Sequence, residues 1–273
     1  MDREPLIRFA TFFGGLVIMA LWEAIAPYRR YRQSKLVRWI SNLGLVVLNT
    51  VILRAVFPVV AVGFAAIASQ NGWGLFNLLS FPAWLTILLS VIALDCAVYW
   101  QHVLFHHVPL FWRLHQVHHA DLDFDVTTGL RFHPIEILLS MGIKLGAIAL
   151  LGPPAVAVLI FEVVLNASSL FNHGNVSLPE GSDRLLRWII VTPDMHRIHH
   201  AVLIEETNSN FGFNLPWWDR LFGTYCAQAQ TNPRRMAIGL PQYQQEQRVG
   251  YLLWMLLLPF WPRLRRYQAG QPE

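Results

Sequence analysis

Long apolar runs occupy most of the chain, and short clusters of charged residues separate them. A membrane-spanning helix needs about 20 mostly apolar residues, and three runs reach that length. Two shorter runs flank a Gly-Pro-Pro sequence that ends helices. The long runs cover residues 6–26, 39–69 and 81–100, and the short ones cover 137–151 and 155–171. We predict an all-α integral membrane bundle of about three full spans plus a helical hairpin that enters the bilayer without necessarily crossing it.

Positive charge is concentrated between the first two runs. This loop carries Arg29, Arg30, Arg32, Lys35 and Arg38. Positive residues in short loops favour the cytoplasmic side, so we expect the loop inside and the N-terminus outside. Counting the passages that follow then puts every histidine on the cytoplasmic face, because the hairpin returns to the side from which it starts.

A last apolar run, 251–261, is too short to span a bilayer and is flanked by Arg248 and by Arg263, Arg265 and Arg266. We expect an interfacial helix there. No repeat or linker is visible, so residues 1–273 are predicted to form one integral membrane domain with a cytoplasmic, histidine-rich metal-binding cap.

Composition supports a bilayer as solvent. Hydrophobic residues make up 54% of the chain and charged residues only 14%, whereas soluble domains carry about 25% charged residues. A disordered protein and a coiled coil are excluded. The net charge of +4 lies in short groups rather than in a long basic stripe, which fits a membrane surface better than nucleic acid. The two cysteines are far apart in the sequence and predict no disulfide framework.

The histidines carry the chemical information, because all eleven fall between His102 and His200. Eight of them form three clusters: His102 and His106 with H-x-x-x-H spacing, and two H-x-x-H-H clusters, His115-His118-His119 and His196-His199-His200. Residues three or four apart share one face of a helix, so each cluster can aim two imidazoles at one metal ion. His107 is expected to point away from that face. The remaining ten are candidate ligands, too many for one metal and suited to two in a shared site: the clustered His102, His106, His115, His118, His119, His196, His199 and His200, completed by the single His133 and His173.

Alternatives to metal binding are a pH-sensitive basic face for the clusters and an ordinary hydrogen-bonding role for each single histidine. Imidazole suits zinc, copper, iron and nickel. The clusters contain no cysteine, which disfavours structural zinc and iron–sulfur sites, and none of the Glu-x-x-His pairs of ferritin-like sites. A haem held by two histidines needs isolated residues on facing helices. A non-enzymatic membrane protein that binds or carries metal or haem is therefore the second reading.

Sequence motifs around these histidines point to a family. The chain reads DCAVYWQH around Asp95, RFHPIE around His133, NHGN around His173 and NFGFNLPWWDRLFGTY over 210–225. Together with the three histidine clusters, these segments resemble the membrane fatty acid hydroxylase and sterol desaturase superfamily. The resemblance covers residues 95–225, which would form the catalytic core.

The resemblance implies an α-helical membrane enzyme that uses two histidine-bound iron ions and dioxygen to hydroxylate or desaturate a sterol, fatty acyl chain or related lipid. Iron is expected in the active form, and zinc can take its place after overexpression, since imidazole accepts both metals. The chain has no cytochrome or flavin signature, so the two electrons must come from an external donor protein of the cytochrome, ferredoxin or reductase type.

Two further residues are candidates for supporting the metal site. Metal-bound histidines need acceptors for their second ring nitrogen. Asp95 lies seven residues before His102, hence on nearly the same helical face, and we expect it to be such an acceptor. Asn210 is expected either to bond a histidine or to shape its loop.

Overall fold

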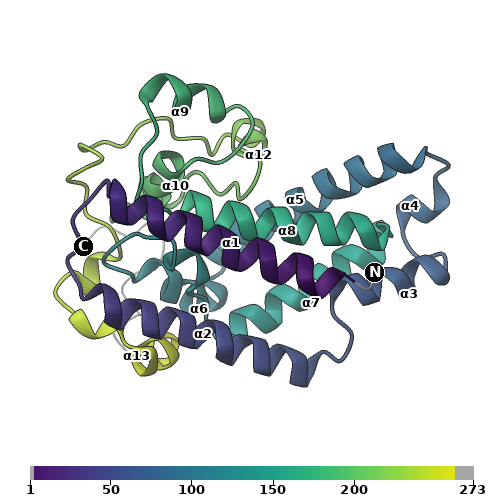
Figure 1. Ribbon diagram of the computed structural model, residues 1–273, viewed down its shortest axis with the longest axis horizontal. Coiled ribbons are helices and arrows are strands. Elements are labelled where there is room, and N and C mark those ends of the chain that lie inside the picture. The colour runs from purple at the N-terminus through teal and green to yellow at the C-terminus, as the bar shows by residue number, and fades with distance from the viewer. Residues whose placement is uncertain (1–2, 262–273) are drawn as a thin grey trace.

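Helices dominate the computed structural model, which describes residues 3–261; within that range no residue belongs to a named strand. By length and composition, five segments can cross a membrane: Glu4–Ile25, Lys35–Leu78, Ala83–His107, Pro134–Leu151 and Ala155–Asn172. The corresponding long helices are α1 (Glu4–Ile25), α2 (Lys35–Val56), α5 (Ala83–His107), α7 (Pro134–Leu151) and α8 (Ala155–Asn172). They run roughly along the long axis of the molecule (Figure 1). The predicted all-α membrane bundle is thus confirmed.

The second apolar run is not one helix. It divides into α2 and α3 (Ala61–Gln70), and the break contains Pro58. Proline has no backbone N–H and forces the residue before it out of the helical conformation. Phe57 accordingly adopts φ −114° and ψ 93°. After the break, α3 packs on α7 and α8 through a cluster of apolar residues that also includes Leu94 of α5.

The predicted helical hairpin is formed by α7 and α8, each 18 residues long. Its turn is at Gly152, whose positive φ of 65° favours glycine. The side-chain amide of Asn77, in the short helix α4 (Leu75–Leu78), donates to the Gly152 carbonyl. The hairpin therefore reaches the end of the bundle where α3 and α5 are joined, and its arms are long enough to span. Across it, Lys144 Nζ lies 2.7 Å from Glu162 Oε1.

Shorter helices gather at the other end of the bundle, away from the N-terminus (Figure 1). The one near the C-terminus, α13, packs on α2, and Leu253 on its outer side is exposed. This short apolar segment is too short to span, as expected, while Arg263, Arg265 and Arg266 lie outside the described residues. The helices of this cap region are α6 (Pro109–His119), α9 (Glu180–Leu186), α10 (Pro193–His199), α11 (Ile204–Thr207), α12 (Trp217–Leu221) and α13 (Leu252–Leu257).

Buried charged residues bind the loop after α6 to the membrane helices α1 and α2. Arg38 of α2 is fully buried, and its guanidinium donates to Asp121 at 2.8 Å and to Asp125 at 2.6 Å. Glu23 of α1 accepts backbone N–H bonds from Val126 and from Asn175. Breaking a buried ion pair by removing one partner costs about 3–5 kcal/mol. These contacts therefore position the segments that carry the histidines.

Candidate metal centre

Nine of the ten predicted histidine ligands meet in the interior of the cap region. They form two groups in which the potential ligand atoms all lie within 4.8 Å of one another. The five-histidine group is His102, His106, His115, His119 and His199; the four-histidine group is His118, His173, His196 and His200. All nine are buried. The parity argument from the sequence is confirmed in this respect, since helices α5 and α8 deliver His102 and His173 to the same end of the bundle.

Each H-x-x-H-H cluster contributes to both groups. In α6, His115 and His119 belong to the five-histidine group, whereas His118 belongs to the four-histidine group. In α10 and its C-cap the division is opposite. His199 belongs to the five-histidine group, whereas His196 and His200 belong to the four-histidine group. Residues four apart are separated by about 40° around a helix, whereas consecutive residues are separated by about 100°. Each H-x-x-H-H cluster therefore directs its histidines to two adjoining sites.

His133 does not lie with the others, contrary to the expectation that it completes the shell. It is the N-cap of α7: its Nδ1 accepts a hydrogen bond from the Ile135 N–H at 3.2 Å, and its Nε2 lies 3.3 Å from the Leu256 carbonyl oxygen. An imidazole with both nitrogens occupied is an ordinary structural residue. His107 is exposed and bonds the Val103 carbonyl, as expected for a residue off the ligand face.

The five-histidine group has the bonding pattern of a metal site. Nδ1 of His102 lies 2.8 Å from the Phe211 carbonyl oxygen, and Nδ1 of His199 lies 2.8 Å from the Ser209 carbonyl oxygen. The Nε2 atoms of all five members are buried without a hydrogen-bond partner among the described residues. An outer acceptor fixes the tautomer so that the other nitrogen offers its lone pair inward. Unpaired buried nitrogens are costly, and a metal ion would satisfy them.

In the four-histidine group the inward nitrogens face one another. His173 Nε2 lies 3.2 Å from His118 Nε2 and 3.0 Å from His196 Nε2, while its Nδ1 bonds the Ser169 carbonyl. Both ring nitrogens of His200 are buried and unpaired among the described residues. Rings of the two groups touch, since the centroids of His119 and His200 are 4.5 Å apart. The donor set is imidazole throughout, which fits iron and zinc alike.

Burial keeps these imidazoles neutral. It lowers the pKa of His115 to about 3, and burial together with neighbouring histidines depresses the pKa of His199 and His200 well below the ordinary value. A neutral imidazole is the form that binds metal. At neutral pH the groups are therefore ready to bind without releasing protons.

Two acceptors of the site were not identified from the sequence. Glu136 of α7 accepts from His115 Nδ1 at 2.7 Å, and Asn208 Oδ1 lies 3.2 Å from His106 Nδ1. Glu136 is only 2% exposed. A carboxylate in the first turn of an apolar helix, inside the RFHPIE motif, was the available signal, because a buried charge needs a partner.

Asp95 supports the site, although not by the predicted contact. Its carboxylate accepts from Asn214 Nδ2, the Leu215 N–H and Trp218 Nε1, and the nitrogen of His102 is bonded instead by the Phe211 carbonyl. Asp95 therefore fixes the 211–218 loop, which in turn orients the histidine.

Asn210 follows the second of its two predicted roles and shapes the loop. It adopts φ 51°, its Nδ2 donates to the Met195 and Cys226 carbonyls, and its Oδ1 accepts from the Cys226 N–H. Asp219 binds the same loop by accepting the N–H groups of Phe211 and Gly212. Burial raises the pKa of Asp219 to about 6. These residues tie the loop to α10.

Comparison with known proteins agrees with this geometry. The family model for fatty acid hydroxylases matches residues 87–224. The chain is 28% identical to ornithine lipid hydroxylase OlsE of Rhizobium tropici, covering 82% of this chain and 68% of that one. It is 30% identical to the alkylglycerol monooxygenase of Homo sapiens, covering 58% of this chain but only 34% of the relative. It is 25% identical to the very-long-chain aldehyde decarbonylase GL1-11 of Oryza sativa subsp. japonica, covering 80% and 83%.

No solved structure matches the chain. The family model nevertheless covers half of it, and the matched segment runs from α5 through both histidine groups to the loop that Asp95 fixes. This chain is a membrane protein of the fatty acid hydroxylase family, a family of lipid-modifying oxidoreductases.

Proposed function

We propose that the chain is a dioxygen-dependent, non-haem di-iron enzyme that hydroxylates or desaturates a membrane lipid. The observation that carries the proposal is the pair of adjoining, buried histidine groups. In the five-histidine group every Nε2 atom lacks a hydrogen-bond partner among the described residues, and in the four-histidine group the Nε2 atoms of His118, His173 and His196 face one another. Residues 1–273 would act as one integral membrane domain, with a catalytic core over 95–225 and the histidines on the cytoplasmic side.

In this proposal the five-histidine group holds one iron ion and the four-histidine group holds the other. Bound iron would supply the activation of dioxygen that breaks an unactivated C–H bond, which side chains alone cannot do. The protein's own residues orient and shield the site. Glu136 keeps the proton of His115 on Nδ1, the Phe211 carbonyl does so for His102, and the surrounding elements leave none of the nine histidines more than 8% exposed.

The substrate is expected to reach the site from the bilayer, because α5 continues from an apolar span directly into His102 and His106. Two relatives are named for the lipids they act on, an ornithine lipid and an alkylglycerol. Both names describe lipids with a polar head rather than sterols. We therefore propose an acyl or alkyl chain of a polar lipid as the substrate class.

The experiment is to purify the protein from cells grown with iron, count its metals and follow oxygen into lipid. We expect two iron ions per chain, and oxygen-18 from labelled dioxygen in one lipid of membranes that contain the active protein. A His118→Ala, His199→Ala double variant at equal abundance is the control. Label incorporated only by the wild type indicates hydroxylation, and a new double bond without label indicates desaturation. Stoichiometric haem absorbance, or turnover without dioxygen, would refute the proposal.

A further inference from the structure

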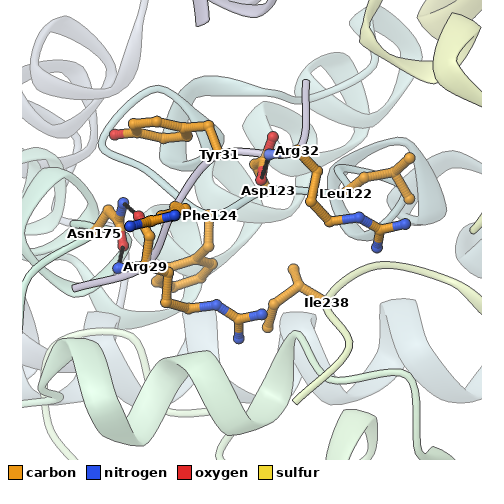
Figure 2. Close-up of a pocket in the computed structure, with 9 residues that line it drawn as sticks. Arg29, Tyr31, Arg32, Leu122, Asp123, Phe124, Asn175 and Ile238 are labelled. Carbon is orange, nitrogen blue, oxygen red and sulfur yellow. Dashed lines mark hydrogen bonds between the residues drawn. The ribbon is translucent and has the colours of Figure 1, made fainter. Parts of the chain in front are cut away.

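A group of arginines lies at the outer end of the bundle, on the loop between α1 and α2 and on the 233–236 segment beside it. We call Arg29, Arg30, Arg32, Arg234 and Arg235 the basic patch. The two segments are joined because the Arg29 guanidinium donates to the Pro233 carbonyl at 3.2 Å and to the Met236 carbonyl. Beside the α1–α2 loop is a small hollow, lined by that loop, by residues 122–124 and by Asn175 and Ile238 (Figure 2).

The positive charge of the patch is not neutralised. The guanidinium groups of Arg32 and Arg29 bond only neutral oxygens. Arg32 donates to the side-chain and backbone oxygens of Gln244, and Arg29 donates to the carbonyls of Pro233 and Met236. Arg30 and Arg235 are exposed, with no side-chain hydrogen bond or ion pair to any described residue. The one carboxylate that lines the hollow, Asp123, accepts two backbone N–H groups and is 6% exposed. The patch therefore presents net positive charge to water.

The floor of the hollow adjoins the metal centre. Phe124 lines the hollow on one side. The centroid of its ring lies 5.1 Å from that of His200 and 5.6 Å from that of His173, both members of the four-histidine group. One aromatic side chain thus separates the hollow from the candidate ligands. Electron transfer weakens exponentially with distance, so a redox centre above this hollow would be well placed to reduce that group.

The patch lies where a water-soluble partner can reach it. The α1–α2 connection lies at the extreme end of the long axis, opposite the end that holds the N-terminus and the α7–α8 turn (Figure 1). The membrane helices run along that axis, so the patch lies past their ends, on the water side of the hydrocarbon core.

We propose that the basic patch is the docking site of an acidic, one-electron redox protein that reduces the metal centre through the four-histidine group. This inference rests on the proposed function. Hydroxylation balances as RH + O₂ + 2 e⁻ + 2 H⁺ → ROH + H₂O, in which the lipid and the donor are oxidised and dioxygen is reduced. The donor therefore supplies two electrons, one in each of two encounters. Such encounters are weak and small in area, and complementary charge raises their association rate.

The test uses the metal-loaded full chain in uncharged nanodiscs and, as probe, a reduced, strongly acidic [2Fe–2S] ferredoxin. The variant is Arg30→Glu with Arg235→Glu, because neither side chain holds the fold together. Arg184→Glu, an exposed arginine on α9, is the matched control. Binding is measured by surface plasmon resonance at low and high salt. We expect the double variant to bind about tenfold more weakly at low salt, with a smaller salt dependence, and the control to bind as the wild type does.

Two further measurements separate this inference from the proposed function. Turnover driven by a small neutral photoreductant should be the same in wild type and double variant, whereas ferredoxin-driven turnover should fall with binding. Absence of turnover under both reductants would count against the proposed function, and the binding data would still report on the patch. The docking inference is overturned if the double variant binds ferredoxin normally, if the wild type does not bind it at low salt, or if the patch instead binds added phosphatidylglycerol vesicles.

Discussion

Removing the Glu136 carboxylate should weaken metal binding by the five-histidine group. Its Oε1 accepts from His115 Nδ1 at 2.7 Å in a buried position. A metal cation on His115 favours the ionised form of the Glu136 carboxyl. A hydrogen bond to a charged group is worth about 1.5–3 kcal/mol, and each 1.4 kcal/mol is about tenfold in affinity. Glu136→Ala should therefore lower iron affinity about 10- to 100-fold, the range typical of such outer partners. Glu136→Gln keeps a neutral acceptor, worth about 0.5–1.5 kcal/mol, and should lose less.

The assay is titration of the metal-free protein with ferrous iron against a competing chelator under anaerobic conditions, with elemental analysis at saturation. Glu162→Gln is the matched control, because Glu162 is also a buried carboxylate but pairs with Lys144 and Arg8 instead of a histidine. Unchanged affinity in Glu136→Ala would refute the argument. Equal weakening in Glu162→Gln would assign the effect to general loss of packing.

The remaining predictions address the two groups, the loop and pH. His199→Ala and His196→Ala, one from each group, should each reduce iron content from two towards one, whereas His133→Ala should keep both; elemental analysis decides this, and loss of metal from the last variant would contradict it. Asp95→Asn loses at least one of its three donors, so iron affinity should fall about tenfold, at the mild end for outer positions, with the protein still inserted; affinity as low as in a ligand variant would refute an indirect role. Arg38→Met should lower the thermal midpoint by leaving buried carboxylates unpaired, and an unchanged midpoint would show that the pair is dispensable. Burial lowers the pKa of the cap histidines below the value of about 6.5 that they have in the unfolded chain. Below about pH 6.5 the unfolded chain therefore binds more protons than the folded one, and the thermal midpoint of the metal-free protein should fall as pH drops from about 6.5 to 5. A rise of the thermal midpoint over this range would contradict the prediction.

Features that depend on local periodicity could be predicted from the amino-acid sequence. Apolar run length predicted the membrane helices, and the three- and four-residue spacing of histidines predicted paired ligands. The Gly-Pro-Pro sequence predicted the hairpin turn at Gly152, because proline stops a helix and glycine accepts positive φ. Counting passages predicted that His102 and His173 would share one end. The first three follow from neighbouring residues, since helix geometry is the same in every protein, and the last follows from the number of apolar runs between the two histidines.

The division of the histidines into two groups, and the partners of their outer nitrogens, depend on contacts between distant parts of the chain. His102 is bonded by a carbonyl 109 residues away, at Phe211. That carbonyl belongs to the 211–218 loop, which is held in place by the hydrogen bonds of Asp95 to Asn214 and Trp218. His133 looked like a ligand by composition, but the start of α7 turns its ring toward the Leu256 carbonyl instead of the centre. The direction of a side chain at a helix end depends on how loops pack against it, and loop packing is set by contacts between residues far apart in the chain, which no local pattern encodes.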